Sequence, residues 1–265
     1  MKPLWPWQVL LFLVLFGLWY GLTETGILPP FFFGRPLIAL QKVWEWFESG
    51  EMTRFSTSWV TIGHLWVTLI ETVLAFVIGT VLGLAVGLWL ALSPTASALL
   101  DPYVKAANSM PRVILAPIFA VWFGLGIWSK VALGVTLVFF IVFFNVYQGV
   151  KEVSPVVLAN ARMLGASARD LLRTVYLPSA TSWVFSSLHT SVGMAFVGAV
   201  VGEYLGSARG VGYLILQSEA VFDINGVFAG IVILTAFALA LDWLVTVAER
   251  RLLVWRPAPG ETEPL

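Results

Sequence analysis

Residues 4–22 form one continuous apolar stretch that contains no charged residue. A helix that spans a bilayer needs about 20 mostly apolar residues, because the bilayer core holds no water to satisfy exposed backbone groups. A cleaved signal peptide is the alternative, since Lys2 precedes the stretch. However, residues 23–26 (TETG) lack the small-residue pattern of a cleavage site, and more apolar stretches follow. We therefore predict a retained membrane anchor.

The composition of the whole chain points the same way. Of its 265 residues, 59% are hydrophobic and 11% are charged, whereas a soluble domain carries about 25% charged residues. The absence of cysteine excludes disulfides and thiolate metal sites, and His64 and His189 are too far apart in sequence to suggest a ligand cluster. The formal net charge is zero, which gives no indication of a nucleic-acid partner. We expect no metal site and no catalytic residue in this chain.

The hydrophobic pattern predicts an all-α polytopic membrane protein, with residues 1–265 in a single transmembrane domain. Six transmembrane helices are placed at 4–22, 65–92, 111–127, 131–150, 183–205 and 227–248. In the second, Gly79, Gly83 and Gly87 repeat every four positions, so they lie on one helix face where a neighbouring helix can approach closely. In and before the third, prolines at 102, 111 and 117 predict a kinked or broken helix.

The positive residues set the predicted orientation. If both termini face the cytoplasm, ten of the 15 Lys and Arg residues fall in cytoplasmic segments and five in outer segments. This split agrees with the positive-inside rule. The first outer loop would then be residues 23–63, and its positions 36–47 have helical amphipathic spacing. That segment is either a helix on the outer interface or a helix packed on the spans.

The loop between the fourth and fifth spans, residues 154–178, contains signals for two short helices. Ser154 suits the N-cap of the first and Pro155 its first position, and Gly165 stops it. Ser167 and Asp170 have the spacing of a capping box that opens the second helix.

The second of these helices is predicted to end at Pro178, and the loop as a whole is predicted to have an apolar side and a basic side. The apolar set consists of Leu164, Ala168, Leu171, Leu172 and Val175, and the basic set of Arg162, Arg169 and Arg173. A loop of this kind is either a docking element for another protein or an interfacial hairpin with arginines near lipid phosphates. The residues alone leave both interpretations open.

This loop resembles the conserved cytoplasmic loop of ABC importer permeases, whose motif is Glu-Ala-Ala, three residues, Gly, nine residues, Ile, one residue and Leu-Pro. The matching positions are Ala159, Asn160, Ala161, Gly165, Val175, Leu177 and Pro178. Ala159 stands where the motif has Glu and Asn160 where it has the first Ala, so any salt bridge made by that Glu is absent. The resemblance covers about residues 28–256 and is closest to the nitrate, sulfonate, taurine and bicarbonate permeases. Its supporting segments are 28–30, 101–102, 117–126, 164–167 and 209–213.

The resemblance implies a type I ABC importer permease fold, in which this loop couples to an ATPase subunit. The residues implied for coupling are Ala159, Asn160, Ala161, Arg162, Leu164, Gly165, Ala166, Ser167, Asp170, Leu177 and Pro178. It also implies a homodimer of permeases, two ATPase subunits that carry ATP and Mg, an extracytoplasmic binding protein and a location in the bacterial inner membrane. The chain has no G-x-x-x-x-G-K-[ST] loop, so we expect no cofactor in it and ATP hydrolysis on a separate subunit.

Ionisable residues within spans are costly and are candidates for function. Glu71, Glu203 and Asp242 all fall near span ends, where a structural role is favoured, with Arg209 expected to pair with Glu203 and Arg250 with Asp242. The candidate residues of a translocation path are Asn108, Asn145, Gln148, Thr190, Ser191, Met194 and Glu203. Hydrogen bonding between helices is the favoured role for most of them.

The predicted function is import of a small solute by alternating access. By analogy with the family, the solute is an oxyanion or sulfonate such as nitrate, taurine, alkanesulfonate or bicarbonate. One alternative is an importer of a pyrimidine-type vitamin precursor. Others are a membrane scaffold without transport and a proton-coupled secondary transporter, although no internal repeat of the kind common in secondary transporters is evident. Residues 206–226 are the predicted outer contact for the binding protein.

Overall fold

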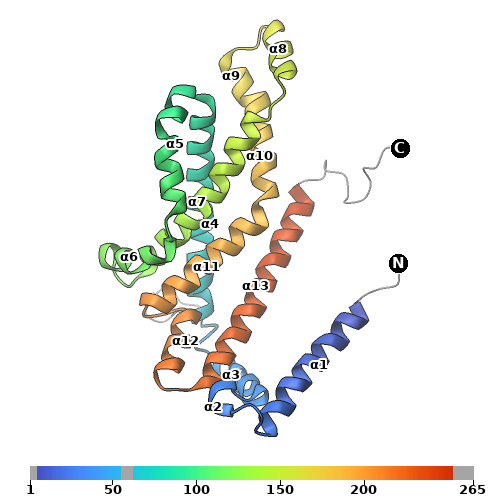
Figure 1. The fold of residues 1–265 in the computed structure, drawn as a ribbon, viewed down its shortest axis with the longest axis vertical. Helices are drawn as coiled ribbons and strands as arrows, with labels where there is room; N and C mark the ends of the chain where they lie inside the picture. Colours follow the sequence, from blue (N-terminus) through green and yellow to red (C-terminus); the bar gives the residue numbers. More distant parts are fainter. Residues whose placement is uncertain (1–4, 55–61, 253–265) are drawn as a thin grey trace. The chain divides into compact units, whose positions relative to one another are not determined.

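The computed structural model describes residues 5–54 and 62–252, and these residues form helices joined by short turns (Figure 1). The α-helices are α1 (Trp5–Glu24), α2 (Pro30–Phe33), α3 (Pro36–Glu48), α4 (His64–Leu92), α5 (Pro94–Ser109), α6 (Leu115–Phe123), α7 (Ile127–Lys151), α8 (Pro155–Met163), α9 (Ala168–Leu171), α10 (Leu177–Ser186), α11 (Leu188–Gly206), α12 (Val211–Ala220) and α13 (Ile224–Leu252). Two short segments have other helical geometry, the 3-10 helix η1 (Arg112–Ile114) and the π-helix η2 (Leu172–Tyr176). The predicted all-α class is confirmed.

Five helical segments of the described chain are long and apolar enough to cross a membrane, and a sixth exists if two bent helices make one span. The five are Pro6–Glu24, His64–Leu92, Ile127–Lys151, His189–Ala220 and Ile224–Val247, and the bent pair is Pro94–Ser109 with Arg112–Phe123. The two members of this pair meet at 78°. The break contains Pro111, whose ring disfavours helical geometry in the residue before it. The third span, predicted at 111–127, therefore corresponds to a bent pair of helices that starts earlier, at Pro94.

The internal contacts of the chain divide it into two compact units. Unit 1 comprises Met1–Thr68 and Glu203–Phe237, and unit 2 comprises Leu69–Gly202 and Ala238–Leu265. The organisation of residues 1–265 as a single transmembrane domain stays a prediction.

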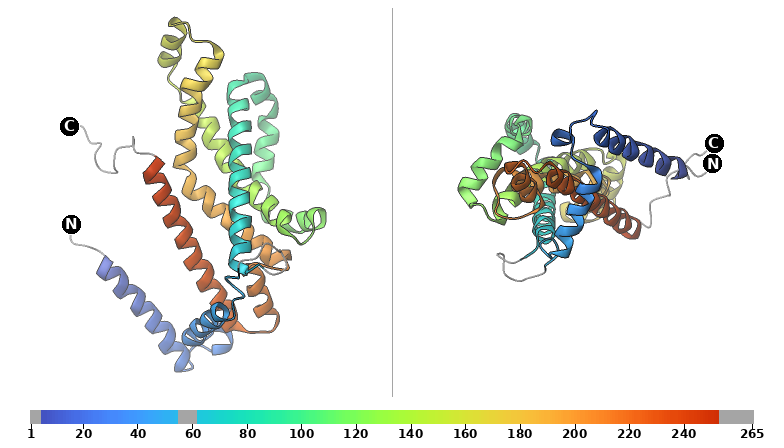
Figure 2. Two further views of the ribbon diagram at one scale, coloured as in Figure 1. Left: turned by 180° about the vertical axis from the view of Figure 1, so that it is seen from behind. Right: turned by 90° about the horizontal axis from the view of Figure 1, so that it is seen from below.

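Within unit 2, α7 packs closely against the part of α4 that carries the three glycines. A Cβ atom on Gly79 would lie 2.7 Å from Val138, and one on Gly83 would lie 2.9 Å from the carbonyl oxygen of Phe139. Val138 is fully buried. The close helix contact that the four-residue glycine repeat predicts is confirmed. α5 returns alongside the C-terminal half of α4, as both ribbon views show (Figures 1 and 2).

α10 packs against the C-terminal part of α7, also within unit 2. The Ser179 hydroxyl donates a hydrogen bond of 2.9 Å to the carbonyl of Gly149, and a side chain at Gly149 would collide with the indole ring of Trp183. The loop of residues 154–178 therefore extends from the adjoining ends of two packed helices, and α8 and α9 lie at that end (Figure 1).

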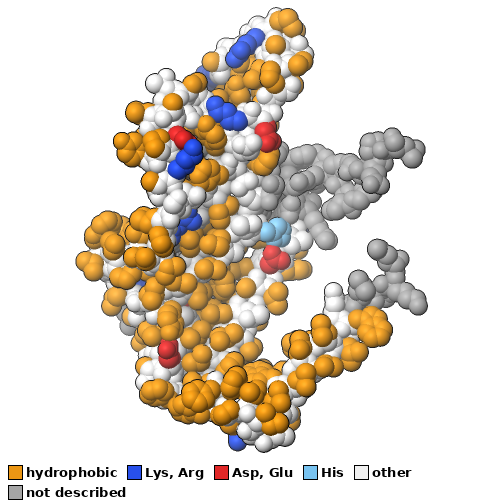
Figure 3. Space-filling view, in the orientation of Figure 1, with side chains coloured by type: hydrophobic (Ala, Val, Ile, Leu, Met, Phe, Trp, Pro, Cys, Tyr) orange, Lys and Arg blue, Asp and Glu red, His pale blue; other side chains and the backbone are white. Residues whose placement is uncertain are grey.

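Within unit 1, α1 packs little against the other elements of that unit, since only 6% of its apolar stretch is buried. The visible face of this helix is almost entirely hydrophobic (Figure 3). α3 instead packs on one side, where Val43 and Trp46 contact a buried cluster around Met52 and Val211. Its other side exposes Trp44 at 70%. Of the two alternatives predicted for residues 36–47, the structure thus favours the helix that packs on other elements.

Candidate functional site

Gly165 ends the first helix of the loop between α7 and α10. α8 ends at Met163, Gly165 has φ of +86°, and the N–H of Ala166 donates to the carbonyl of Ala161 at 3.0 Å. Glycine adopts this left-handed conformation without the penalty that a Cβ atom brings. A Cβ at this position would meet nothing within 4 Å, so the conformation and not crowding requires the glycine. The predicted helix stop is confirmed.

The starts of the two loop helices differ in how well they are capped. Pro155 stands in the first turn of α8 as predicted, but Ser154 at the N-cap position makes no side-chain cap hydrogen bond. At α9 the capping box is complete. The backbone N–H of Ser167 donates to the Asp170 carboxylate at 3.0 Å, and the backbone N–H of Asp170 donates to the Ser167 hydroxyl oxygen at 3.3 Å.

We expect the capping box to protect α9 in a pH-dependent way. The Ser167 hydroxyl, and then its backbone N–H, donate hydrogen bonds that lower the pKa of Asp170. A lowered pKa stabilises the folded loop above the ordinary aspartate value of about 3.9, and the stabilisation disappears as the pH falls through the lower folded value. Asp170→Ala should therefore speed amide hydrogen exchange in residues 168–171 several-fold at pH 7, measured by mass spectrometry.

Measuring the exchange at several pH values tests whether the charged Asp170 carboxylate is the cause of this protection. The difference between wild type and Asp170→Ala should shrink as the pH falls below the ordinary aspartate value of about 4 and through the lowered pKa of the folded loop. Asp101→Ala removes another exposed carboxylate, one paired with Lys105, and should leave the exchange of residues 168–171 unchanged. Equal exchange in wild type and Asp170→Ala at pH 7 would show that the box does not stabilise α9.

The second loop helix does not end at Pro178, so that prediction is wrong. α9, η2 and α10 follow one another without a break, and Pro178 stands in the first turn of α10. In a regular α-helix the proline ring would collide with the carbonyl four residues earlier, at Thr174. Thr174 lies in the wide π turn η2, and such a turn changes the spacing of the carbonyls ahead of the proline.

The tip of the loop exposes apolar side chains. Leu164 is 89% exposed, Met163 78% and Val156 65%, whereas Leu171 is buried. The apolar face predicted for the loop is therefore split, because the turn at Gly165 separates Leu164 from the packed Leu171. Exposed apolar groups clustered in this way mark a contact surface.

Three arginines lie on the same loop as these exposed apolar side chains. Arg162, Arg169 and Arg173 are exposed, and Figure 3 shows basic side chains toward this end of unit 2. Of the residues predicted for coupling, Ala159, Asn160, Arg162, Leu164, Gly165, Ser167, Asp170 and Pro178 are exposed, and Ala161, Ala166 and Leu177 are half-buried. These residues are spread over α8, the turn after it, α9 and the start of α10, and their role in coupling stays a prediction.

The candidate path residues form hydrogen bonds mainly along their own helices. Asn145 donates to the carbonyl of Ile141 at 2.8 Å, and Gln148 donates to Glu152 at 2.8 Å. Asn108 accepts from Arg112 at 2.5 Å. On α11, Thr190 is exposed, Ser191 is buried and Met194 is half-buried. These bonds give most of the polar groups a local structural role, and their place in a path stays a prediction.

Glu203 is buried in unit 1, and each of its carboxylate oxygens accepts a hydrogen bond. Its Oε2 accepts from the backbone N–H of Gly212 at 2.8 Å, and its Oε1 accepts from the Thr68 hydroxyl at 2.6 Å. The same hydroxyl oxygen accepts from the N–H of Val211 at 3.1 Å. A buried carboxylate is tolerated only with such donors, so Glu203 fixes the start of α12. Its predicted pairing with Arg209 stays a prediction.

Sequence reasoning missed His64, which lies at the start of α4. Its Nδ1 lies 3.0 Å from the backbone nitrogen of Gly210, within unit 1. Gly210 has φ of +107°, and a Cβ there would collide with the Glu203 carboxylate. The sequence signal that could have revealed this contact is segment 209–213, one of those that support the family resemblance. Its two glycines are the residues that contact Glu203 and His64.

The other two acidic residues have different surroundings within unit 2. Glu71 is fully buried. Asp242 is exposed, and its carboxylate lies 2.7 Å from Nδ1 of His189. Arg250, the predicted partner of Asp242, has a side chain outside the described part of the structure. Within residues 5–54 and 62–252, no group of three His, Cys, Asp or Glu residues is arranged to hold a metal ion.

A match to a protein family shows what kind of protein this chain is. Residues 79–254 match the family described as the binding-protein-dependent transport system inner membrane component. The chain belongs to this family. It is therefore an ABC transporter permease, an inner-membrane component with several apolar helices, as the resemblance implied. This assignment does not favour the proton-coupled alternative.

Individual relatives and one solved structure agree with the family. A protein of Bacillus subtilis (strain 168) named as an aliphatic sulfonates transport permease is 30% identical over 95% of this chain and 88% of its own length. The formylaminopyrimidine transport permease protein of Halalkalibacterium halodurans is 34% identical over 73% of this chain and 77% of its own. The inward-facing MetNI methionine ABC transporter superposes with a TM-score of 0.61 at 20% identity, covering 71% of this chain and 92% of that chain. The fold is the type I ABC importer permease fold.

Proposed function

We propose that this permease moves a small oxyanion or sulfonate, such as nitrate, taurine, an alkanesulfonate or bicarbonate, across the bacterial inner membrane. The relative named for aliphatic sulfonates supports this substrate class. The relative named for formylaminopyrimidine supports a pyrimidine-type precursor as the second candidate. Uptake assays in which a sulfonate competes with formylaminopyrimidine distinguish the two candidate substrates.

In this proposal the permease works as a homodimer with two ATPase subunits and an extracytoplasmic binding protein. ATP and Mg are held by the ATPase subunits, and both termini of the permease face the cytoplasm. The observation that carries the proposal is the apolar tip of the loop of residues 154–178, since Leu164 is 89% exposed and has arginines nearby. A side chain of that kind gains most when a partner protein covers it.

The proposed mechanism is alternating access driven by that partner. ATP binding closes the ATPase dimer, and the loop follows its motion as a rigid body. The helices of the two permeases then rock, and a path between them opens toward the binding protein, which contacts residues 206–226. Hydrolysis restores the first state. The candidate path residues on α7 and α11 are proposed to line this route.

The test removes one exposed leucine from the loop. Alanine at a central contact of a protein interface costs about 2 kcal/mol, or roughly thirtyfold in affinity. We therefore expect Leu164→Ala to lose most of the ATPase subunit on co-purification and to lose transport, while its thermal unfolding stays that of wild type. Leu37→Ala is the matched control, because Leu37 is a 55% exposed leucine of α3, a helix on the predicted outer side.

The possible outcomes separate the interpretations. Loss of the ATPase subunit from Leu164→Ala but not from Leu37→Ala supports docking through the loop. An ATPase subunit retained equally by all three proteins would place its docking surface elsewhere. If wild type itself co-purifies with no ATPase subunit, the proposed assembly is wrong.

A further inference from the structure

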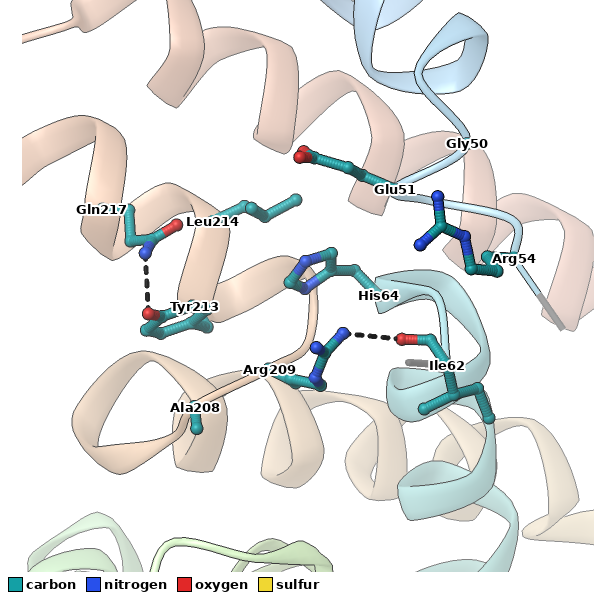
Figure 4. A pocket seen from close by; sticks show the side chains of 10 residues that line it. All are labelled: Gly50, Glu51, Arg54, Ile62, His64, Ala208, Arg209, Tyr213, Leu214 and Gln217. Carbon is teal, nitrogen blue, oxygen red and sulfur yellow. Dashed lines mark hydrogen bonds between the residues drawn. The ribbon is translucent and has the colours of Figure 1, made fainter. Parts of the chain in front are cut away.

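Unit 1 contains a cavity of about 370 Å³ whose lining is rich in hydrogen-bond donors (Figure 4). The residues that line it are Gly50, Glu51, Arg54, Ile62, His64, Ala208, Arg209, Tyr213, Leu214 and Gln217. Its volume lies within the range of about 300–1,000 Å³ that is usual for small-molecule sites. In the proposed orientation these residues lie on the outer side of the membrane.

His64 contributes one donor to this cavity. Its Nδ1 lies 3.0 Å from the N–H of Gly210 and 3.1 Å from the carbonyl oxygen of the same residue. That carbonyl already accepts from the N–H of Leu214, whereas the buried N–H of Gly210 needs an acceptor. We assign Nδ1 as that acceptor, so the proton of the neutral ring is on Nε2. In Figure 4 the ring lies between Glu51 and Arg209.

A second donor comes from α12. The amide of Gln217 donates to the hydroxyl oxygen of Tyr213 at 2.6 Å, as the dashed line in Figure 4 marks. Since Gln217 is the donor in that bond, the hydroxyl hydrogen of Tyr213 is available to a ligand.

Two arginines add positive charge to the lining. Arg209 is held in place by a hydrogen bond of 2.9 Å from its Nη1 to the carbonyl of Ile62. Arg54 is exposed, and within residues 5–54 and 62–252 no carboxylate forms an ion pair with it. The two arginines and Glu51 leave a net charge of +1 among the lining residues, with His64 neutral.

We propose that this cavity binds one oxyanion group, a sulfonate or a carboxylate. The two arginines, His64 and Tyr213 line it and supply hydrogen-bond donors, and planar guanidinium groups match the geometry of such anions. The group has two possible sources, a small anion in solution or an acidic side chain of the binding protein. The proposal rests on the proposed function only for the side of the membrane on which the cavity opens.

The experiment titrates the purified full-length permease with methanesulfonate and follows the ligand by saturation-transfer NMR at constant ionic strength. Arg54→Gln should weaken binding about tenfold, the loss expected for one charge-assisted hydrogen bond. Glu51→Gln should tighten binding about threefold, because it removes the opposing charge at an exposed position. A gain of affinity in Glu51→Gln cannot arise from misfolding. Arg35→Gln is the control, since Arg35 is an exposed outer arginine that pairs with Glu24 and does not line the cavity.

A second measurement identifies the source of the anion. If methanesulfonate does not bind, but Arg54→Gln weakens and Glu51→Gln strengthens the affinity of the permease for its binding protein, the oxyanion is an acidic side chain of that protein. If neither variant differs from wild type and Arg35→Gln in either measurement, the cavity is not an oxyanion site. The NMR titration needs no ATPase, so its result is independent of the outcome for Leu164→Ala.

Discussion

Gly210→Ala is expected to prevent the accumulation of folded protein. The backbone of Gly210 has φ of +107° and ψ of 166°, a region that is essentially restricted to glycine and costs other residues about 1–3 kcal/mol. The new methyl group would also occupy the position of the Glu203 carboxylate. Moving a buried carboxylate off its donors costs about 3 kcal/mol or more. The sum approaches the total stability of a typical protein, about 5–15 kcal/mol.

Two further variants separate the cost of backbone strain at Gly210 from the cost of the collision with the Glu203 carboxylate. Gly26→Ala introduces a side chain at another positive φ, +75°, where nothing lies within 4 Å, so it should lower the melting temperature only slightly. In a Glu203→Ala background, adding Gly210→Ala should cost less than it does in wild type, because the colliding carboxylate is gone. If the losses of stability caused by the two substitutions simply add, Gly210 and Glu203 do not interact in this way. The measurements are the yield of monodisperse protein and its thermal unfolding in detergent.

Gly83→Leu is expected to separate α4 from α7. A Cβ at Gly83 would lie 2.9 Å from both the carbonyl oxygen of Phe139 and Cβ of Val142. Neither atom belongs to a flexible side-chain end, so the helices themselves must move. Overpacking a tight core costs about 1–3 kcal/mol for added methylenes, and a leucine adds four carbon atoms at this contact. We expect a large fall in the melting temperature and loss of transport.

The control for this change is Gly17→Leu. Gly17 lies in α1, is exposed, and would have nothing within 4 Å of its Cβ. The same substitution there should leave thermal unfolding close to that of wild type. If both variants unfold at the same temperature as wild type, the glycine repeat in α4 does not determine its packing on α7.

The sequence predicted those features that depend on local chemistry. The apolar stretches predicted an all-helical chain because backbone groups in a bilayer can be satisfied within a helix. The stop at Gly165 and the capping box at Ser167 depend on residues within one turn of each other. The glycine repeat in α4 predicted a close contact, since its spacing alone puts the glycines on one helix face.

Features that depend on distant or cooperative contacts could not be predicted in this way. Pro178 was expected to end a helix, because nothing in its neighbours indicates the π turn that accommodates it. His64 and Gly210 meet across 146 positions of the sequence, so no local pattern indicates their contact. The exposure of Leu164 also depends on the turn before α9, which removes it from the face formed by Leu171.

The attachment of the loop at both of its ends determines its stiffness. One end continues from α7 after Lys151, and the other enters α10, which is fastened to α7 at Gly149. A segment held at two points bends less under a load than one held at a single point. We infer that a force applied at Leu164 displaces α7 and α10 as a pair. Since α7 has 25 residues, it transmits that displacement over about 37 Å to its other end without an intervening hinge.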